Sequence, residues 1–134
     1  MKSVVALFGE SEKGKYNVPY LLKEVPQLID MLGNPPEDSE GIYYAIQTLL
    51  FQRDLIFFRV EIEGFSPPDY MNGFKYLEKT ADLHALCLPG VGDPRIIDAS
   101  QSICHKHKSL LITNQKDLYD YLTSNLQNPR PRKN

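Results

Sequence analysis

The chain has 134 residues, of which 42% are hydrophobic and 24% charged, as in a globular domain with a single core. Its formal net charge of −2 lacks the basic excess that is typical of nucleic-acid-binding proteins. No apolar run approaches the ~18 residues of a membrane-spanning helix, and the first apolar run is too short for a signal peptide. We therefore expect a cytoplasmic protein without nucleic-acid or membrane partners.

The first half of the chain predicts strands and helices around a polar loop. This loop, residues 9–17, has two glycines but the spacing of neither a phosphate-binding loop nor a dinucleotide fingerprint. A short extended piece is expected at residues 20–23, and whether it joins the sheet stays open. The other expected elements are a buried strand at 3–8, a helix opened by Pro26 and closed by Gly33, a helix at 40–52 capped by Ser39, and a strand at 54–63 whose second half alternates between buried and exposed positions.

The helix predicted at residues 40–52 has apolar residues at helical spacing, which indicates a buried stripe. Tyr43, Tyr44 and Phe51 widen this stripe, and we interpret them as core or interface residues rather than as a ligand cage. The stripe itself consists of Ile42, Ala45, Ile46, Leu49 and Leu50.

The second half of the chain is organised around an apolar run at residues 83–88, which stops at Pro89. A turn with two glycines follows, Asp93 is the expected helix cap, and Pro94 stands at the first helical position, where its missing N–H costs nothing. The other expected elements are a helix from Pro67 or Pro68 through residue 79, a helix at 94–107, a strand at 109–113, a helix at 115–126 capped by Asn114, and a disordered tail at 128–134.

Strands that alternate with helices are typical of a mostly parallel sheet with right-handed crossovers. We therefore expect a single α/β domain over residues 1–127. Its predicted architecture is a three-layer sandwich, in which a mostly parallel sheet of about four strands has helices on both faces.

Open parallel sheets bind ligands outside the carboxyl ends of their strands, so these ends supply the candidate site residues. The glycines before Asp93 offer free amides to an anion at a helix N-terminus, although a tight turn needs such glycines equally. The candidates for binding an anion or a small ligand are Gly9, Ser11, Gly90, Gly92 and Asn114.

No catalytic residue, cofactor or metal site is predicted. Ser11 and Ser66 lie outside a GxSxG elbow, and Pro89 stands where a receiver domain would need its phosphorylated aspartate. His105 and His107 are two residues apart on a predicted helix, which points them to different sides and argues against a metal cluster.

The two cysteines, Cys87 and Cys104, fall on a predicted strand and a predicted helix. We expect them to be small buried hydrophobic residues in a reducing compartment. A disulfide or redox pair is the alternative, although their spacing is not that of a CxxC motif.

Several motifs, in order along residues 6–112, resemble the contractile-tail sheath proteins of phages, tailocins and related injection machines. GESEKGKYNVPYLL is similar to the G-x-x-x-x-G-x-x-N-x-P pattern that follows their first strand, and QLIDMLG resembles the short helix after it. IYYAIQTLLFQ with DLIFFRVE, and GFKYLEKTADLHALCLPGVGDP, resemble two later passages. The matching residues are Gly9, Gly14, Asn17, Pro19, Leu21, Leu22, Leu32, Gly33, Tyr44, Ala45, Phe51, Arg59, Val60, Gly73, Leu77, Glu78, Leu86, Pro89, Gly90 and Asp93.

The resemblance implies a structural α/β module without catalysis, which self-associates or binds protein partners. The chain departs from the family at residues 52–54, where QRD replaces a glycine-rich link, and in lacking the family's long insertion and further C-terminal domain. Tyr16, Tyr43, Phe65 and Tyr70 are the expected exposed interface anchors. The alternative is a flavodoxin-like or Rossmann-like domain that binds a nucleotide or another small molecule, either as a binding module or as an enzyme.

Overall fold

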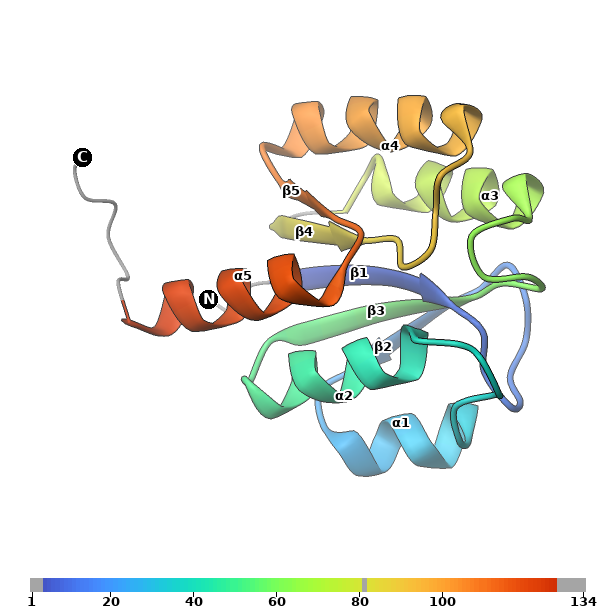
Figure 1. Ribbon diagram of the computed structural model, residues 1–134, viewed down its shortest axis with the longest axis vertical. Coiled ribbons are helices and arrows are strands. Elements are labelled where there is room, and N and C mark those ends of the chain that lie inside the picture. Colours follow the sequence, from blue (N-terminus) through green and yellow to red (C-terminus); the bar gives the residue numbers. More distant parts are fainter. Residues whose placement is uncertain (1–3, 81, 128–134) are drawn as a thin grey trace.

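The computed structural model describes residues 4–80 and 82–127, without the side chains of residues 125–127. Strands and helices alternate over most of this length (Figure 1). The elements are β1 (Val4–Gly9), β2 (Pro19–Leu22), α1 (Val25–Leu32), α2 (Gly41–Leu50), β3 (Asp54–Arg59), α3 (Pro67–Leu77), β4 (Leu83–Cys87), α4 (Pro94–His107), β5 (Leu110–Ile112) and α5 (Gln115–Gln127).

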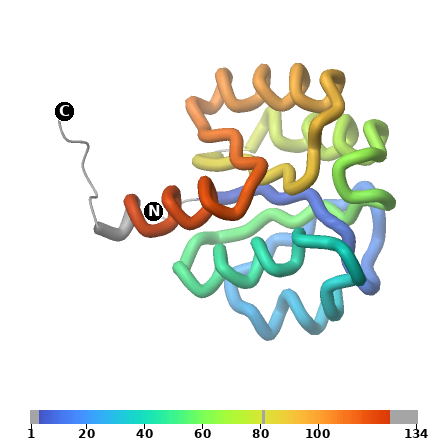
Figure 2. The backbone as a smooth tube through the Cα atoms, viewed as in Figure 1, coloured from blue at the N-terminus to red at the C-terminus, as the bar shows by residue number. Residues whose placement is uncertain are grey.

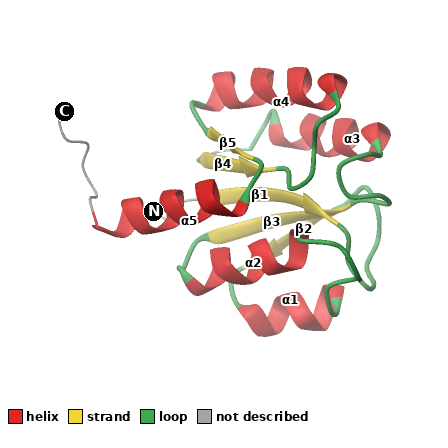
Figure 3. Ribbon diagram, in the orientation of Figure 1, coloured by secondary structure: helices red, strands yellow, loops and turns green. Residues whose placement is uncertain are grey.

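The five strands form one sheet in the order β2-β3-β1-β4-β5 (Figure 3). β1, β3, β4 and β5 run parallel to one another, whereas β2 pairs with β3 in the antiparallel direction. The predicted mostly parallel sheet is therefore confirmed. The short extended piece near residue 20 joins it as an edge strand, which makes five strands rather than four.

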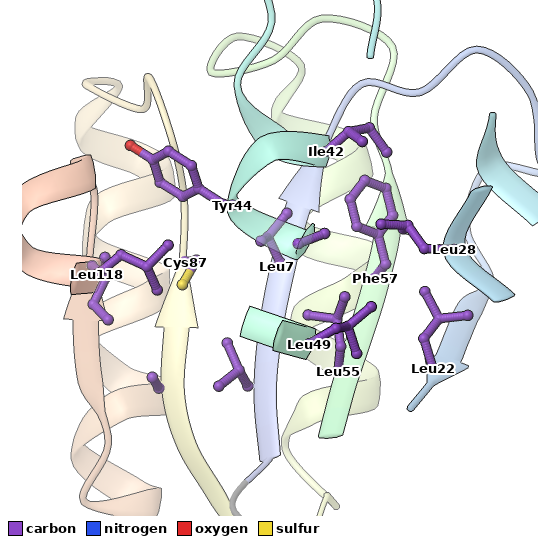
Figure 4. Packing of buried hydrophobic residues seen from close by; sticks show 14 of the residues in the cluster. Leu7, Leu22, Leu28, Ile42, Tyr44, Leu49, Leu55, Phe57, Cys87 and Leu118 are labelled. Atoms are coloured by element: carbon purple, nitrogen blue, oxygen red, sulfur yellow. The ribbon is translucent and has the colours of Figure 1, made fainter. Parts of the chain in front are cut away.

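Helices cover both faces of the sheet, so the predicted three-layer sandwich is confirmed (Figure 1). Successive side chains of a strand point to opposite faces, and β1 sends Leu7 to one face and Phe8 to the other. On the face of Leu7, helices α1, α2 and α5 enclose a mainly aliphatic core (Figure 4). Helices α3 and α4 cover the face of Phe8.

The core on the α3/α4 face is built from aromatic rings. The ring of Phe8 stacks on Phe58 at 4.7 Å and on Tyr70 at 5.1 Å between centroids, and it meets Phe74 edge-on at 5.2 Å. Gly73 lies directly over this stack, and a Cβ atom there would run into the ring of Phe8. The close approach explains why a helix contains a residue of such low helical propensity.

Three expectations about these elements are wrong. The strand expected at residues 54–63 ends at Arg59, because the chain turns away after Val60, whose N–H donates to the Gly9 carbonyl at 3.0 Å. Ser39 does not cap α2, since its hydroxyl donates to the Pro36 carbonyl at 2.7 Å, and Glu40 is the N-cap residue. Leu50, expected in the buried stripe, is 67% exposed at the end of α2.

Other boundaries agree closely with the sequence patterns. Helix α4 spans Pro94–His107 as predicted, and the Asp93 carboxylate caps it by accepting from the Arg95 N–H at 2.8 Å. The tail expected at residues 128–134 and the first residue of the strand expected at 3–8 lie outside the described residues. Among the helices that are described, none is both long and apolar enough to cross a membrane.

Candidate functional site at the carboxyl edge of the sheet

The carboxyl ends of the four parallel strands meet at one edge of the sheet, and the chain path reverses there. From β1 the chain moves first to the β3 side of the sheet and afterwards crosses to β4 on the other side (Figure 2). Ligands of such sheets bind where the strand order reverses, which in this protein is between β1 and β4. Gly9 ends β1, Gly90 and Gly92 follow β4, and Asn114 follows β5, so these candidates lie at the carboxyl edge of the sheet.

The amides at this edge of the sheet are bonded to the chain's own Glu63. Its carboxylate accepts from the N–H groups of Glu10 at 2.9 Å, Glu40 at 2.7 Å and Gly41 at 3.1 Å. Two of these amides lie at the start of α2, where a bound phosphate would sit in many nucleotide-binding proteins. The Glu63 carboxylate thus occupies the anion position between β1 and α2.

Glu10 completes this arrangement, because its own carboxylate accepts from the Glu63 N–H at 2.9 Å. Burial raises the pKa of the Glu63 carboxyl, and its three amide donors act in the opposite direction. Gly9 has a steric reason to be glycine, since a Cβ atom there would lie 2.8 Å from the Cα of Gly41. Gly9 therefore serves the contact between β1 and α2.

The turn after β4 is also filled from within the chain. Gly90 has a φ of 78°, which an L-residue adopts only with strain, and its carbonyl lies against Gly64. Both carboxylate oxygens of Asp93 accept from Arg95, and these hydrogen bonds hold the pKa of Asp93 below its usual value. Asp93 therefore occupies the N-terminus of α4, whereas Gly92 borders open space.

The two remaining candidates make local hydrogen bonds. The Ser11 hydroxyl is buried and donates to the Lys13 carbonyl at 2.8 Å. The Asn114 side chain caps α5 by accepting from the Asp117 N–H at 2.9 Å. The structure thus brings the five candidates to one edge of the sheet, but the bonds of Ser11 and Asn114 close two loops and leave neither side chain directed at a shared ligand position.

The sequence patterns did not predict one pocket at this edge of the sheet. It lies between the first turns of α2 and the start of α5, has a volume of about 270 Å³, and its lining includes Glu40, Tyr43, Tyr44, Gln47 and Gln115. Tyr44 is only 2% exposed. The sequence pattern assigned Tyr44 to the buried stripe of its helix. Only the spacing of Glu40, Tyr44 and Gln47, which lie along one side of a helix, could have indicated that they share a pocket.

The turn between β3 and α3 holds two large hydrophobic side chains in solvent. The Phe65 N–H donates to the Ile62 carbonyl at 2.9 Å, and the Gly64 N–H donates to the buried Tyr70 hydroxyl at 2.7 Å. With Glu63 bonded as described, the turn is fixed at each of its central residues. Ile62 is nevertheless 51% exposed and Phe65 68% exposed.

Three of the four expected interface anchors are exposed, and the fourth is buried. Tyr16, Tyr43 and Phe65 are exposed as predicted, and the Tyr16 ring lies 4.5 Å from the Arg59 guanidinium. The expectation for Tyr70 is wrong. This side chain is fully buried in the aromatic core, where its hydroxyl accepts the Gly64 hydrogen bond.

Cys87 and Cys104 are both free thiols and both buried, as the sequence pattern predicted. Burial raises the pKa of Cys104 to about 11, and burial also raises the pKa of Cys87. The ring of His107 bonds to the Leu77 carbonyl at 2.7 Å. Among the described residues, no three His, Cys, Asp or Glu side chains come together as metal ligands would.

Comparisons with protein-family models, with curated proteins and with solved structures found no match for this chain.

Proposed function

We propose that this protein is a non-catalytic structural or interaction module, related to the α/β domain of contractile-tail sheath proteins, that self-associates or binds a protein partner. One observation carries the proposal: at the edge where α/β proteins bind ligands, the chain fills the anion positions with its own Glu63 and Asp93. The ordered motifs from residue 6 to residue 112 are the reason for naming the sheath family.

The exposed side chains at the same edge support an interaction role. Ile62 and Phe65 stand in solvent on a turn whose backbone is already fixed by hydrogen bonds. A fixed turn loses little conformational entropy when a partner covers it, and a few large side chains that become buried, aromatic ones above all, dominate the binding energy at many protein interfaces. We therefore assign the turn formed by residues 62–65 as the main contact with the partner.

Photo-crosslinking tests this function. The full chain, carrying a photoreactive phenylalanine analogue at position 65, is expressed together with the proteins encoded beside its gene. A crosslink at position 65 to one such protein or to a second copy is expected, and Phe65→Ser should weaken the association of the unlabelled chain in sedimentation velocity. Leu50→Ser is the matched control, because Leu50 is equally exposed but lies at the other end of α2.

The alternative, a small-molecule or nucleotide-binding domain, makes the opposite predictions. A nucleotide, flavin or phosphate at 100 times its dissociation constant would stabilise the fold by about 2.7 kcal/mol, which a thermal-shift measurement detects readily. A monomer that forms no crosslink from position 65, together with a thermal shift caused by one of these ligands, would replace the proposed function with this alternative.

A further inference from the structure

The pocket between α2 and α5 contains buried polar atoms that the described chain leaves without hydrogen-bond partners. These atoms are the hydroxyl of Tyr44 and the side-chain oxygen of Gln47. Figure 4 shows the Tyr44 hydroxyl directed away from the aliphatic core around Leu7 and Leu49. Buried polar groups without partners are rare in folded proteins, because leaving them unpaired is costly.

The charges around this pocket are negative. The Glu40 carboxylate lines it and lies beside the Tyr44 hydroxyl, although no hydrogen bond of ordinary geometry joins them. Burial, followed by Glu40 and then more weakly by Glu63, raises the pKa of Tyr44, so its hydroxyl stays protonated. Lys116, which follows Gln115 on α5, donates instead to Asp120 at 2.9 Å.

The start of α2 would ordinarily favour an anion, since helix N-termini carry partial positive charge. In this protein the Glu63 carboxylate already accepts from the two amides there, those of Glu40 and Gly41. What remains available to a ligand is therefore a set of acceptors: the Glu40 carboxylate and the Gln47 oxygen, with the Tyr44 hydroxyl able to accept as well. Such a set favours a ligand rich in N–H donors and positively charged.

The shape of the pocket narrows the choice of ligand further. Tyr43, whose side chain is 55% exposed, lines the cavity of about 270 Å³, and the buried Tyr44 borders it. Aromatic faces attract cations, and among protein side chains the planar guanidinium group both stacks on rings and presents several donors in one plane. An ammonium group is compact and strongly hydrated, so it would stack less well on the exposed Tyr43 ring.

We propose that the pocket between α2 and α5 binds the guanidinium group of an arginine side chain presented by a protein partner. The proposal deepens the proposed function and rests on it for the nature of the partner. The pocket is joined to the exposed turn at residues 62–65 through the bonds between Glu63 and the Glu40 amide, so one partner can occupy both.

The site is tested by NMR titration of the full chain with three small probes: N-acetylarginine amide, N-acetyl-lysine amide and N-acetylcitrulline amide. Citrulline has the shape of arginine without its charge. The arginine probe should bind in the millimolar range, shift the resonances of Tyr43, Tyr44 and Gln47, and bind more tightly than the lysine probe. The citrulline probe should cause no shift at these residues.

Two variants locate the binding. Glu40→Gln keeps the backbone N–H that Glu63 requires and should raise the dissociation constant of the arginine probe roughly fivefold, whereas the matched control Glu37→Gln, at an exposed position nearby, should leave it unchanged. Tyr44→Phe should raise it roughly threefold. The backbone NMR spectrum of each variant shows whether it is folded.

Three results would overturn the proposal: no binding of the arginine probe at about 100 mM, far above the millimolar range expected, equal binding of the citrulline or lysine probe, or binding that Glu40→Gln does not weaken. Such a result would remain distinct from a failure of the proposed function, because the titration uses the free chain. A crosslink from position 65 combined with a negative titration would reject only the arginine pocket.

Discussion

The two faces of the sheet use buried tyrosine residues in opposite ways. On the α3/α4 face, Tyr70 stacks on Phe8 and its hydroxyl accepts a hydrogen bond from the Gly64 N–H at 2.7 Å. On the α1/α2/α5 face, Tyr44 is buried to almost the same degree, but its hydroxyl borders a pocket and has no such bond. The tyrosine hydroxyl on the α3/α4 face is therefore hydrogen-bonded within the protein, whereas the one on the α1/α2/α5 face is available to a ligand.

Under the proposed function, this difference would separate the residues that stabilise the fold from those that bind a partner. The aromatic core fixes the turn at residues 62–65 through Tyr70, and Glu63 of that turn then reaches across the sheet edge to the start of α2. The α3/α4 face thereby positions the start of α2, which forms one side of the pocket on the other face. Substitutions on the two faces are expected to change the stability of the fold by different amounts.

The largest effect is expected from Glu63→Ala, which separates the two faces at the carboxyl edge. Three amides lose their acceptor, and these amides are exposed or only part-buried, so water can partly replace the carboxylate. At about 1 kcal/mol net for each hydrogen bond, a loss of about 3 kcal/mol in unfolding free energy is expected. Urea denaturation measures it, with the exposed Glu61→Gln as control. A loss under about 1 kcal/mol would mean that water replaces the carboxylate without cost.

A smaller effect is expected from Gly73→Ala on the aromatic face. The new methyl group would overlap the Phe8 ring, and overpacking a core costs about 1–3 kcal/mol despite the better helical propensity of alanine. Gly92→Ala is the matched control, because no atom lies within 4 Å of a Cβ built there. Thermal unfolding of the two variants compares them, and equal melting temperatures would contradict the described position of Phe8.

Removing one oxygen atom from each face should have unequal effects, one of which is the smallest expected. Tyr70→Phe leaves the buried Gly64 N–H without an acceptor and should destabilise the fold by about 1–3 kcal/mol. Tyr44→Phe removes a buried hydroxyl that lacks a partner, so no hydrogen bond is lost and the fold should be as stable as before or more stable. Urea denaturation of both variants decides; equal losses would show that the two faces do not differ in this respect.

Local patterns in the sequence were enough to predict much of the fold. Helix α4 was placed correctly because Asp93 and Pro94 are adjacent start signals, and their effect depends on neighbours in the chain. Uninterrupted apolar runs likewise located β1 and β4, since strands buried on both faces need no alternation.

The errors concern residues whose partners are distant in the chain. Glu63 was read as the end of a strand, but its amide partners lie 22, 23 and 53 positions away. Tyr70 was expected on the surface because its aromatic neighbours come from β1 and β3, and no local pattern brings them together. The pocket was missed for the same reason, since Gln115 joins it from the far end of the chain.

The carboxylate at the start of α2 has a consequence for evolution and for engineering. Because the Glu63 carboxylate belongs to the same chain, its effective concentration at the amides of Glu40 and Gly41 is high. Dissolved phosphate or sulfate therefore competes poorly for these amides. Replacing Glu63 by a smaller, uncharged residue would expose the N–H groups of Glu10, Glu40 and Gly41 to the solvent. We therefore expect a Glu63 substitution to leave these amides open to a dissolved anion.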